Sequence, residues 1–88
     1  IEEVSISEMS LYPNPTNGLI TIDLSSKINQ TVSISLVDLT GRTVSEHVQN
    51  VQLGGNKLSL DYTYLVSGVY LLNLRSETGL LSMRLIIQ

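Results

Sequence analysis

The single histidine of the chain, His47, is the first residue to consider for acid–base chemistry, because histidine is the side chain that titrates near neutrality. Glu46 precedes it, and a histidine–carboxylate pair is part of many catalytic sites. Both lie in residues 43–53, which we predict to be a strand, and adjacent strand residues point to opposite faces. The pair therefore cannot converge on one ligand, and no nucleophile accompanies it. We interpret His47 as a surface residue with a structural role.

Three aspartates, Asp23, Asp38 and Asp61, are the next candidates, because Ca²⁺ prefers carboxylate oxygens as ligands. They are spread along the chain without the dense, fixed spacing of a calcium loop. Asp38 precedes Thr40-Gly41, and we interpret it as a turn residue whose side chain accepts backbone N–H groups. The chain has no cysteine, so no thiolate can ligate a metal or attack a substrate. We predict no metal, no cofactor and no enzymatic activity.

Tyrosine rings are suited to stacking on sugars, and the chain has four tyrosines but no tryptophan. Tyr70 falls on the inward face of a run that we predict to be a central strand. Tyr62 and Tyr64 have the same parity, so an exposed platform made by both would form a carbohydrate site. Packing of this pair at one end of the fold is the simpler interpretation, and we prefer it.

The elements that must position these residues are strands. The chain contains no alanine, the best helix former. Valine, isoleucine, threonine and tyrosine, which suit a pleated and half-buried surface, together make up 27 of the 88 residues. This composition excludes a helical bundle.

Charge and hydropathy limit the partners. Charged residues make up 15% of the chain and the net charge is −3, so a basic stripe for nucleic acid or anionic lipid is missing. The longest apolar run, residues 69–72, is four residues long. A membrane-spanning helix needs about 20, so we predict no transmembrane segment. The chain begins at Ile1 without methionine or the regions of a signal peptide, and we expect it to be a piece of a longer precursor.

A period of two in apolar residues recurs along the chain and predicts seven short strands joined by turns. Near Glu8 the alternation changes phase, which indicates a bulge or a strand that switches sheets. We expect an all-β fold, namely a seven-stranded antiparallel β-sandwich of the immunoglobulin or fibronectin-III kind, in preference to an eight-stranded barrel. The predicted strands are residues 4–11, 19–25, 31–39, 43–53, 58–62, 69–76 and 80–87.

Within this pattern, residues 43–53 are only weakly apolar and predict an edge strand, whereas residues 69–76 are apolar on both faces and predict a central strand. Residues 54–56 (GGN) are predicted to turn the chain. We further expect a positive φ angle at three glycines in connections, and Pro13 and Pro15 to stiffen the start of the second strand. The three glycines are Gly18, Gly41 and Gly68.

Four segments, taken in order, resemble a known family. Residues 11–18 (LYPNPTNG) resemble the YPNP-x-x-G opening of the type A C-terminal sorting domain of the type IX secretion system of Bacteroidetes. Residues 37–44 (VDLTGRTV) resemble its D-x-x-G-R/K-x-V hairpin, residues 65–72 (LVSGVYLL) its L-x-x-G-x-Y strand, and residues 83–88 (MRLIIQ) its terminal basic–aliphatic strand. The residues that carry the first three motifs are Tyr12, Pro13, Asn14, Pro15, Gly18, Asp38, Gly41, Arg42, Gly68 and Tyr70.

The resemblance implies a function that composition alone does not. Such domains end secreted cargo proteins, are read by an outer-membrane translocon after the cargo has folded in the periplasm, and are then removed by a cell-surface cysteine protease of the sortase kind. The cargo is released or joined to lipopolysaccharide. We accordingly expect residues 1–10 to be the end of a linker and the first strand, residues 11–88 to be the sorting domain, and cleavage to fall upstream of Ile1 or within residues 1–10.

The last strand is where we expect recognition. If it lies at a sheet edge, its unpaired N–H and C=O groups can dock onto a receptor by strand addition, with Arg84 orienting the contact. The predicted recognition residues are Arg84, Leu85, Ile86, Ile87 and Gln88. The competing hypothesis is an adhesion or carbohydrate-binding module of a surface enzyme. Glycan binding through Tyr62 or Tyr64 would favour that alternative, whereas a sorting signal requires Gln88 to be the native end of the gene product.

Overall fold

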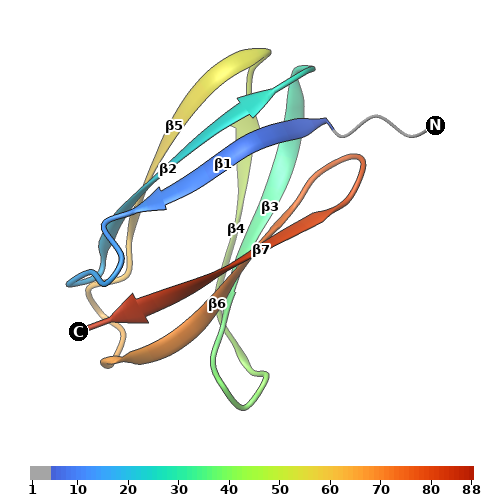
Figure 1. Ribbon diagram of the computed structural model, residues 1–88. Coiled ribbons are helices and arrows are strands. Elements are labelled where there is room, and N and C mark those ends of the chain that lie inside the picture. The colour runs from blue at the N-terminus through green and yellow to red at the C-terminus, as the bar shows by residue number, and fades with distance from the viewer. Residues whose placement is uncertain (1–4) are drawn as a thin grey trace.

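The computed structural model describes residues 5–88 and contains only strands as regular elements within that range (Figure 1). None of the described elements is a helix of the length and hydrophobicity needed to cross a membrane. The strands are β1 (Ile6–Tyr12), β2 (Leu19–Ser26), β3 (Gln30–Val37), β4 (Thr43–Val51), β5 (Gly54–Asp61), β6 (Gly68–Arg75) and β7 (Leu80–Ile87).

The strands form two antiparallel sheets that face one another across the core (Figure 1). One sheet has the order β1-β2-β5 and the other the order β4-β3-β6-β7. This arrangement confirms the predicted seven-stranded, immunoglobulin-like sandwich. It also confirms the two strand positions read from the apolar pattern, because β4 is an edge strand and β6 lies between β3 and β7.

The core lies between the sheets and is built by the period of two. In β3, Val32, Ile34 and Leu36 are fully buried and alternate with polar or partly buried neighbours. In β6, Leu72 and Leu74 do the same. Each such side chain stabilises the fold by about 1.5–3 kcal/mol relative to exposure, which is how a chain without disulfides holds together. The remaining completely buried aliphatic side chains are Ile6, Ile22, Val51 and Leu85.

The phase change in the first strand is a β-bulge. Glu8 has a φ of 52°, and the register of β1 against β2 shifts between Ser7 and Ser10. A bulge adds one residue to one strand and moves the following side chains to the other face. The alternation therefore resumes with Leu11 in the core.

Two details of the prediction are wrong. Residues 54–56 do not form the turn but begin β5, where Gly54 pairs with Ser26 and Asn56 with Leu24. The Asn56 side chain instead holds the crossing between the sheets, accepting from Gln52 N at 2.9 Å and donating to Gln52 O at 2.8 Å. The second error concerns Gly68, for which we predicted a positive φ angle.

Gly18 and Gly41 do have positive φ angles, of 121° and 91°. Gly68 does not, because it is the first residue of β6 and pairs with Ile87 in the regular ladder. Gly54, which begins β5, has a φ of 104° instead. The third glycine with a positive φ angle therefore lies at the crossing between the sheets, just before the main part of β5, and not at the start of β6.

The connections divide between the two ends of the sandwich (Figure 1). We call the end that holds residues 13–18, 38–42 and 62–68 and the terminal Gln88 the motif end, because all four resemblance segments reach it. The opposite end holds Ser5, where the described chain begins, together with the turns after β2, β4 and β6. Ser5 N donates to Thr78 Oγ1 at 2.8 Å there, so Ser5 is fixed to that end.

Candidate recognition site

The segment between β1 and β2 fastens the last strand. The Asn14 side chain donates to Arg84 O at 2.7 Å and accepts from Ile86 N at 3.0 Å. An amide side chain has one donor and one acceptor side by side, as a peptide group does, so Asn14 imitates a neighbouring strand. Pro13 and Pro15 flank it and leave no backbone N–H of their own to pair.

Thr16 continues this contact with its backbone. Thr16 N donates to Ile86 O at 2.9 Å, and Gln88 N donates to Thr16 O at 2.8 Å, which makes a short parallel bridge. Its hydroxyl donates to Leu19 O at 2.7 Å and accepts from Gly18 N at 3.0 Å, so this buried polar side chain is satisfied. We refer to residues 14–16 as the clasp.

The clasp changes the expectation for strand addition. β7 lies at a sheet edge, which meets the condition for strand addition, but its outward backbone groups at Ile86 and Gln88 are already paired with the clasp. Alternate residues of an antiparallel strand direct their backbone groups outward. The outward groups of Leu80 and Ser82 receive no clasp contact, so the open part of the edge is the beginning of β7 and not its end.

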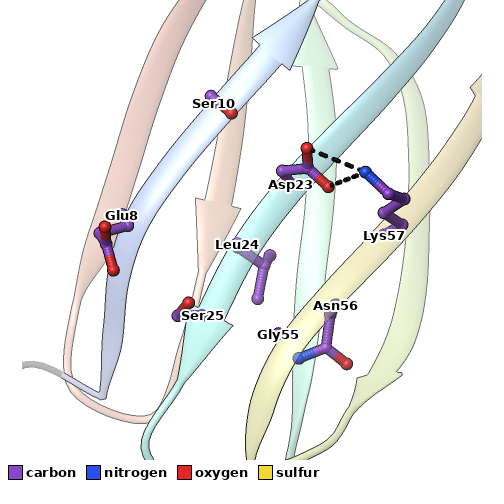
Figure 2. Close-up of a pocket in the computed structure, with 8 residues that line it drawn as sticks. All are labelled: Glu8, Ser10, Asp23, Leu24, Ser25, Gly55, Asn56 and Lys57. Atoms are coloured by element: carbon purple, nitrogen blue, oxygen red, sulfur yellow. Dashed lines mark hydrogen bonds and ion pairs between the residues drawn. The ribbon is translucent and has the colours of Figure 1, made fainter.

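Tyr12 ties the same segment to the outer face of the three-stranded sheet. Its hydroxyl donates to Asp23 Oδ2 at 2.7 Å, and Lys57 Nζ lies 3.0 Å from Asp23 Oδ1. Figure 2 shows Asp23 on β2 and Lys57 on β5 pointing toward each other, with Glu8 of β1 apart from them. The Tyr12 hydrogen bond and the Lys57 ammonium hold the pKa of Asp23 below its ordinary value. Asp23 and Lys57 are therefore paired with each other in this shallow polar groove, and Glu8 lines it separately.

The connection between β3 and β4 is organised by Asp38, which confirms its predicted turn role. Its Oδ1 accepts from Thr40 N at 2.9 Å, Thr40 Oγ1 at 2.6 Å and Arg42 N at 3.0 Å. Its other oxygen lies 3.3 Å from Arg42 Nε. These hydrogen bonds, led by that from the Thr40 hydroxyl, lower the pKa of the Asp38 carboxyl. Gly41 supplies the positive φ that closes the turn.

The connection between β5 and β6 is also organised by an aspartate side chain that accepts hydrogen bonds from the turn. Asp61 Oδ1 accepts from Thr63 N at 2.9 Å and from Thr63 Oγ1 at 2.6 Å, and these two bonds lower the pKa of Asp61. Tyr70, on the inward face as predicted, donates from its hydroxyl to Val66 O at 2.6 Å and so fixes the far side of the loop. Asp38 and Tyr70, which belong to the family motifs, thus shape loops and do not present free polar groups.

Tyr62 and Tyr64, the two tyrosines considered for sugar binding, differ in burial. Tyr62 is buried, with 2% of its surface exposed, whereas Tyr64 is 67% exposed. Burial raises the pKa of Tyr62 to about 12, an effect that the neighbouring Ser45 hydroxyl reduces only in part, and its hydroxyl has no protein hydrogen-bond partner of ordinary geometry. The exposed platform does not form, and the packing that we preferred holds for Tyr62 but not for Tyr64, because a turn separates the two residues and reverses the simple parity.

These loops enclose a cleft of about 430 Å³ at the motif end. The 38–42 turn lines one side and residues 64–70 line the other, and Val44 also contributes to the lining. Two of the segments that carry the resemblance, residues 37–44 and 65–72, therefore line one surface region.

A family model described as the secretion system C-terminal sorting domain matches residues 10–88. The chain belongs to this family. No curated protein matches the chain. The sorting domain is thus a type IX secretion signal that is fused to cargo, is handled by the type IX machinery and directs export toward the cell surface or the medium. Its family is one of sorting signals and not of enzymes.

The predicted recognition residues of the sorting domain separate into two groups. Leu85 and Ile87 are buried in the core, so their side chains are not accessible in the folded domain. Arg84, Ile86 and Gln88 reach the surface. Neither of the two ion pairs formed within residues 5–88 includes Arg84, so its guanidinium is available to a partner.

The other candidates for chemistry do not assemble into a site. Glu46 is exposed, while His47 pairs with Ile34 across β3 and β4 and lies on the opposite face. Within residues 5–88, no group of three histidine, cysteine, aspartate or glutamate residues is placed to hold a metal ion. Asp23, Asp38 and Asp61 lie on different elements, each engaged in hydrogen bonds of its own.

Sequence reasoning missed Thr16 and the exposed apolar residues Leu39 and Val66. Thr16 occupies an unspecified position of the YPNP-x-x-G pattern, and nothing local indicates its contact with residues 86–88. Leu39 and Val66 did leave a signal, because each is a large aliphatic residue within a turn segment where polar residues are usual.

Proposed function

We propose that the sorting domain is read in its folded form by the outer-membrane translocon, after the cargo has folded in the periplasm, and is then removed at the cell surface by a cysteine protease of the sortase kind. The observation that carries this proposal is the family match over residues 10–88 together with the meeting of the family's motifs at one end of the sandwich.

The fold supports recognition of a folded unit. Residues 5–88 have their own core and contain the clasp that closes the end of β7, so the terminal strand is part of a cooperative domain. Leu85 and Ile87 contribute to that core. A receptor for the folded domain meets Arg84, Ile86 and Gln88, and these three residues replace the original five as our proposed contact set on β7.

The position of β1 supports cleavage before Ile6. Residues Ile6–Tyr12 are paired with β2, and a protease needs its substrate segment extended and free of such pairing. Of the predicted cleavage range, residues 1–4 lie outside the described residues. Mass spectrometry of the domain released from exporting cells should find its new N-terminus at or before Ile6. An N-terminus within residues 7–10 would contradict this placement.

Export of a reporter tests the sorting function. A fluorescent protein that folds in the periplasm would carry an inner-membrane leader at its start and the sorting domain at its end, in a bacterium with a type IX system. We expect fluorescence at the cell surface or in the medium, and retention in the periplasm when the sorting domain is removed. Periplasmic retention of the complete fusion would contradict the proposal.

Arg84→Ala tests recognition separately from folding. The clasp contacts Arg84 through its backbone carbonyl, so the substitution leaves that hydrogen bond in place. We expect a free energy of unfolding within about 0.5 kcal/mol of the wild type and reduced export of the reporter. Arg75→Ala is the matched control, because Arg75 is an exposed arginine of the same sheet near the opposite end. Equal export of both variants and the wild type would exclude a role for the Arg84 charge.

A further inference from the structure

We infer that the cleft between the 38–42 turn and residues 64–70 is a docking pocket for an apolar side chain of the outer-membrane translocon, on a protein segment that also carries a carboxylate opposite Arg84. This inference rests on the sorting function proposed above and names the surface that performs it. We call the cleft, with its rim residues Leu39, Tyr64 and Val66, the docking cleft.

The rim of the docking cleft is apolar and exposed. Leu39 is 80% exposed, Val66 is 79% exposed and Tyr64 is 67% exposed, although all three lie in connections where polar residues cost nothing. Val44, Leu65 and Val69 continue the apolar surface into the cleft. Contiguous apolar surface on a small soluble domain marks an interaction site, whereas single exposed residues do not.

Most of the polar side chains that line the docking cleft are already bonded within the domain. The Asp38 oxygens are used by Thr40 and Arg42, and the Tyr70 hydroxyl is used by Val66 O. A pocket for a small polar ligand needs a few convergent polar groups that remain free. The cleft offers shape and apolar surface instead, which suits the aliphatic or aromatic anchor of a protein partner.

Charge next to the cleft defines the partner further. Val69, which lines the cleft, pairs with Ile86, and the next outward residue of β6, Leu71, pairs with Arg84. A segment seated in the cleft therefore reaches the Arg84 guanidinium, which has no ion-pair partner among residues 5–88. The Arg42 guanidinium is neutralised by Asp38. A carboxylate facing Arg84 complements this positive charge.

The position of the cargo agrees with this assignment. In a C-terminal sorting domain the cargo precedes β1, and β1 starts at the opposite end of the sandwich (Figure 1). The docking cleft is at the motif end, and the length of the strands separates the two. A translocon protein can therefore occupy the cleft without meeting the cargo, which allows one receptor to serve passengers of different shape.

The test compares charge placed in the cleft with the same charge placed elsewhere. Leu39→Glu and Val66→Glu put a carboxylate on the rim, and Leu53→Glu is the matched control, since Leu53 is 66% exposed in the turn after β4 at the opposite end. Each variant is attached to the fluorescent reporter in the type-IX-competent bacterium. Thermal unfolding of the purified domains checks that all three remain folded, as substitutions of exposed residues should.

We expect both rim variants to lower the exported fraction of the reporter by at least about fivefold, and Leu53→Glu to leave it unchanged. Normal export of both rim variants, with the wild type exported, would overturn the docking cleft and leave the sorting function intact. Failure of the wild-type fusion to be exported would overturn the sorting function itself. An equal loss of export with Leu53→Glu would also overturn the docking cleft, because the loss would then result from the added charge and not from its position.

Binding to lipid is separated by a second measurement. The purified domain is mixed with protein-free vesicles made of outer-membrane lipids and sedimented. We expect it to remain in the supernatant, because the motif end has no unpaired lysine and its cleft is concave. Sedimentation with the vesicles that Leu39→Glu abolishes would assign the apolar rim to the membrane and overturn the proposal.

Discussion

At the scale of single residues, Asn14 has a definite task. It closes the end of β7 with two hydrogen bonds to backbone groups some seventy positions away in the chain. We predict that Asn14→Ala lowers the free energy of unfolding by about 1–2 kcal/mol, since each net hydrogen bond contributes about 1 kcal/mol. Urea unfolding measures the change, and amide exchange at Ile86 should become faster in the variant.

Asn50→Ala serves as the control for this loss. The Asn50 side chain accepts from the Thr31 hydroxyl at 2.9 Å on an exposed face and holds no distant segment. We expect a change of no more than about 0.5 kcal/mol and no faster exchange at Ile86. If Asn14→Ala lowered the free energy of unfolding no more than Asn50→Ala does, the Asn14 contacts of the clasp would not stabilise the domain.

Tyr62 is the opposite case, because its buried hydroxyl opposes folding. Tyr62→Phe keeps the ring in the core and removes a polar group without a protein partner, so we predict a gain of about 1 kcal/mol in the free energy of unfolding. The wild-type pKa of about 12 is raised by burial above the ordinary 10.0. The unfolded chain therefore loses this proton at a lower pH than the folded domain, so the free energy of unfolding falls as the pH rises from 10.0 toward 12, and the variant should not show this fall. Destabilisation by the substitution would show that the hydroxyl has a favourable contact.

At the scale of the elements, three glycines give a graded test of the connections. A Cβ at Gly18 would lie 2.6 Å from Thr63 Cα, and the φ there is 121°. Gly41 has a φ of 91° but open space around it, and Gly68 has neither problem. We predict a cost of about 3 kcal/mol or more for Gly18→Ala, about 1–2 kcal/mol for Gly41→Ala and less than about 0.5 kcal/mol for Gly68→Ala.

Chemical denaturation of the three purified variants measures this order. Alanine at Gly18 meets backbone atoms, which cannot move aside as a flexible side chain can. A cost at Gly68 equal to that at Gly41 would mean that the start of β6 is as constrained as a left-handed turn. That result would contradict the regular pairing of Gly68 with Ile87.

Much of the element order was predictable because burial on one face imposes a period of two. The same pattern located the bulge at Glu8 and the edge position of β4. The start of β5 was not predictable from local chemistry, because Gly54 and Asn56 favour turns in isolation and pair with β2 only in the folded sheet. The contact between Thr16 and Ile86 is likewise a property of the assembled sandwich, with no local signature.

At the scale of the whole molecule, the meeting of the motifs follows from topology. Each strand crosses the sandwich once, so successive connections alternate between the two ends. The first, third and fifth connections and the end of the seventh strand must share one end, and these are the places where the family motifs occur. An odd number of strands also puts the start of β1 at the other end, away from the docking cleft.

Stability against acid is a second property of the whole domain, because aspartates at three separate places have lowered pKa values. Hydrogen bonds from Tyr12, Thr40 and Thr63 are the leading causes at Asp23, Asp38 and Asp61. A carboxyl whose folded-state pKa is below its unfolded value of 3.8 contributes stability above that pH, which is lost as the pH falls through the lower folded-state pKa. We predict a urea midpoint that is level between about pH 5 and 8 and declines below about pH 4.

Asp38→Asn locates one part of this decline. Asparagine keeps an acceptor for Thr40 N and Arg42 N but carries no charge and does not titrate, so the variant should be less stable than the wild type at pH 7. Its midpoint should approach that of the wild type as the pH falls below 3.8, because the wild-type carboxyl is then losing its own charge. A constant difference between the two proteins from pH 7 down to about pH 2 would show that Asp38 acts through shape alone. Convergence of the two curves would show that the charge of Asp38 stabilises the turn that forms one wall of the docking cleft.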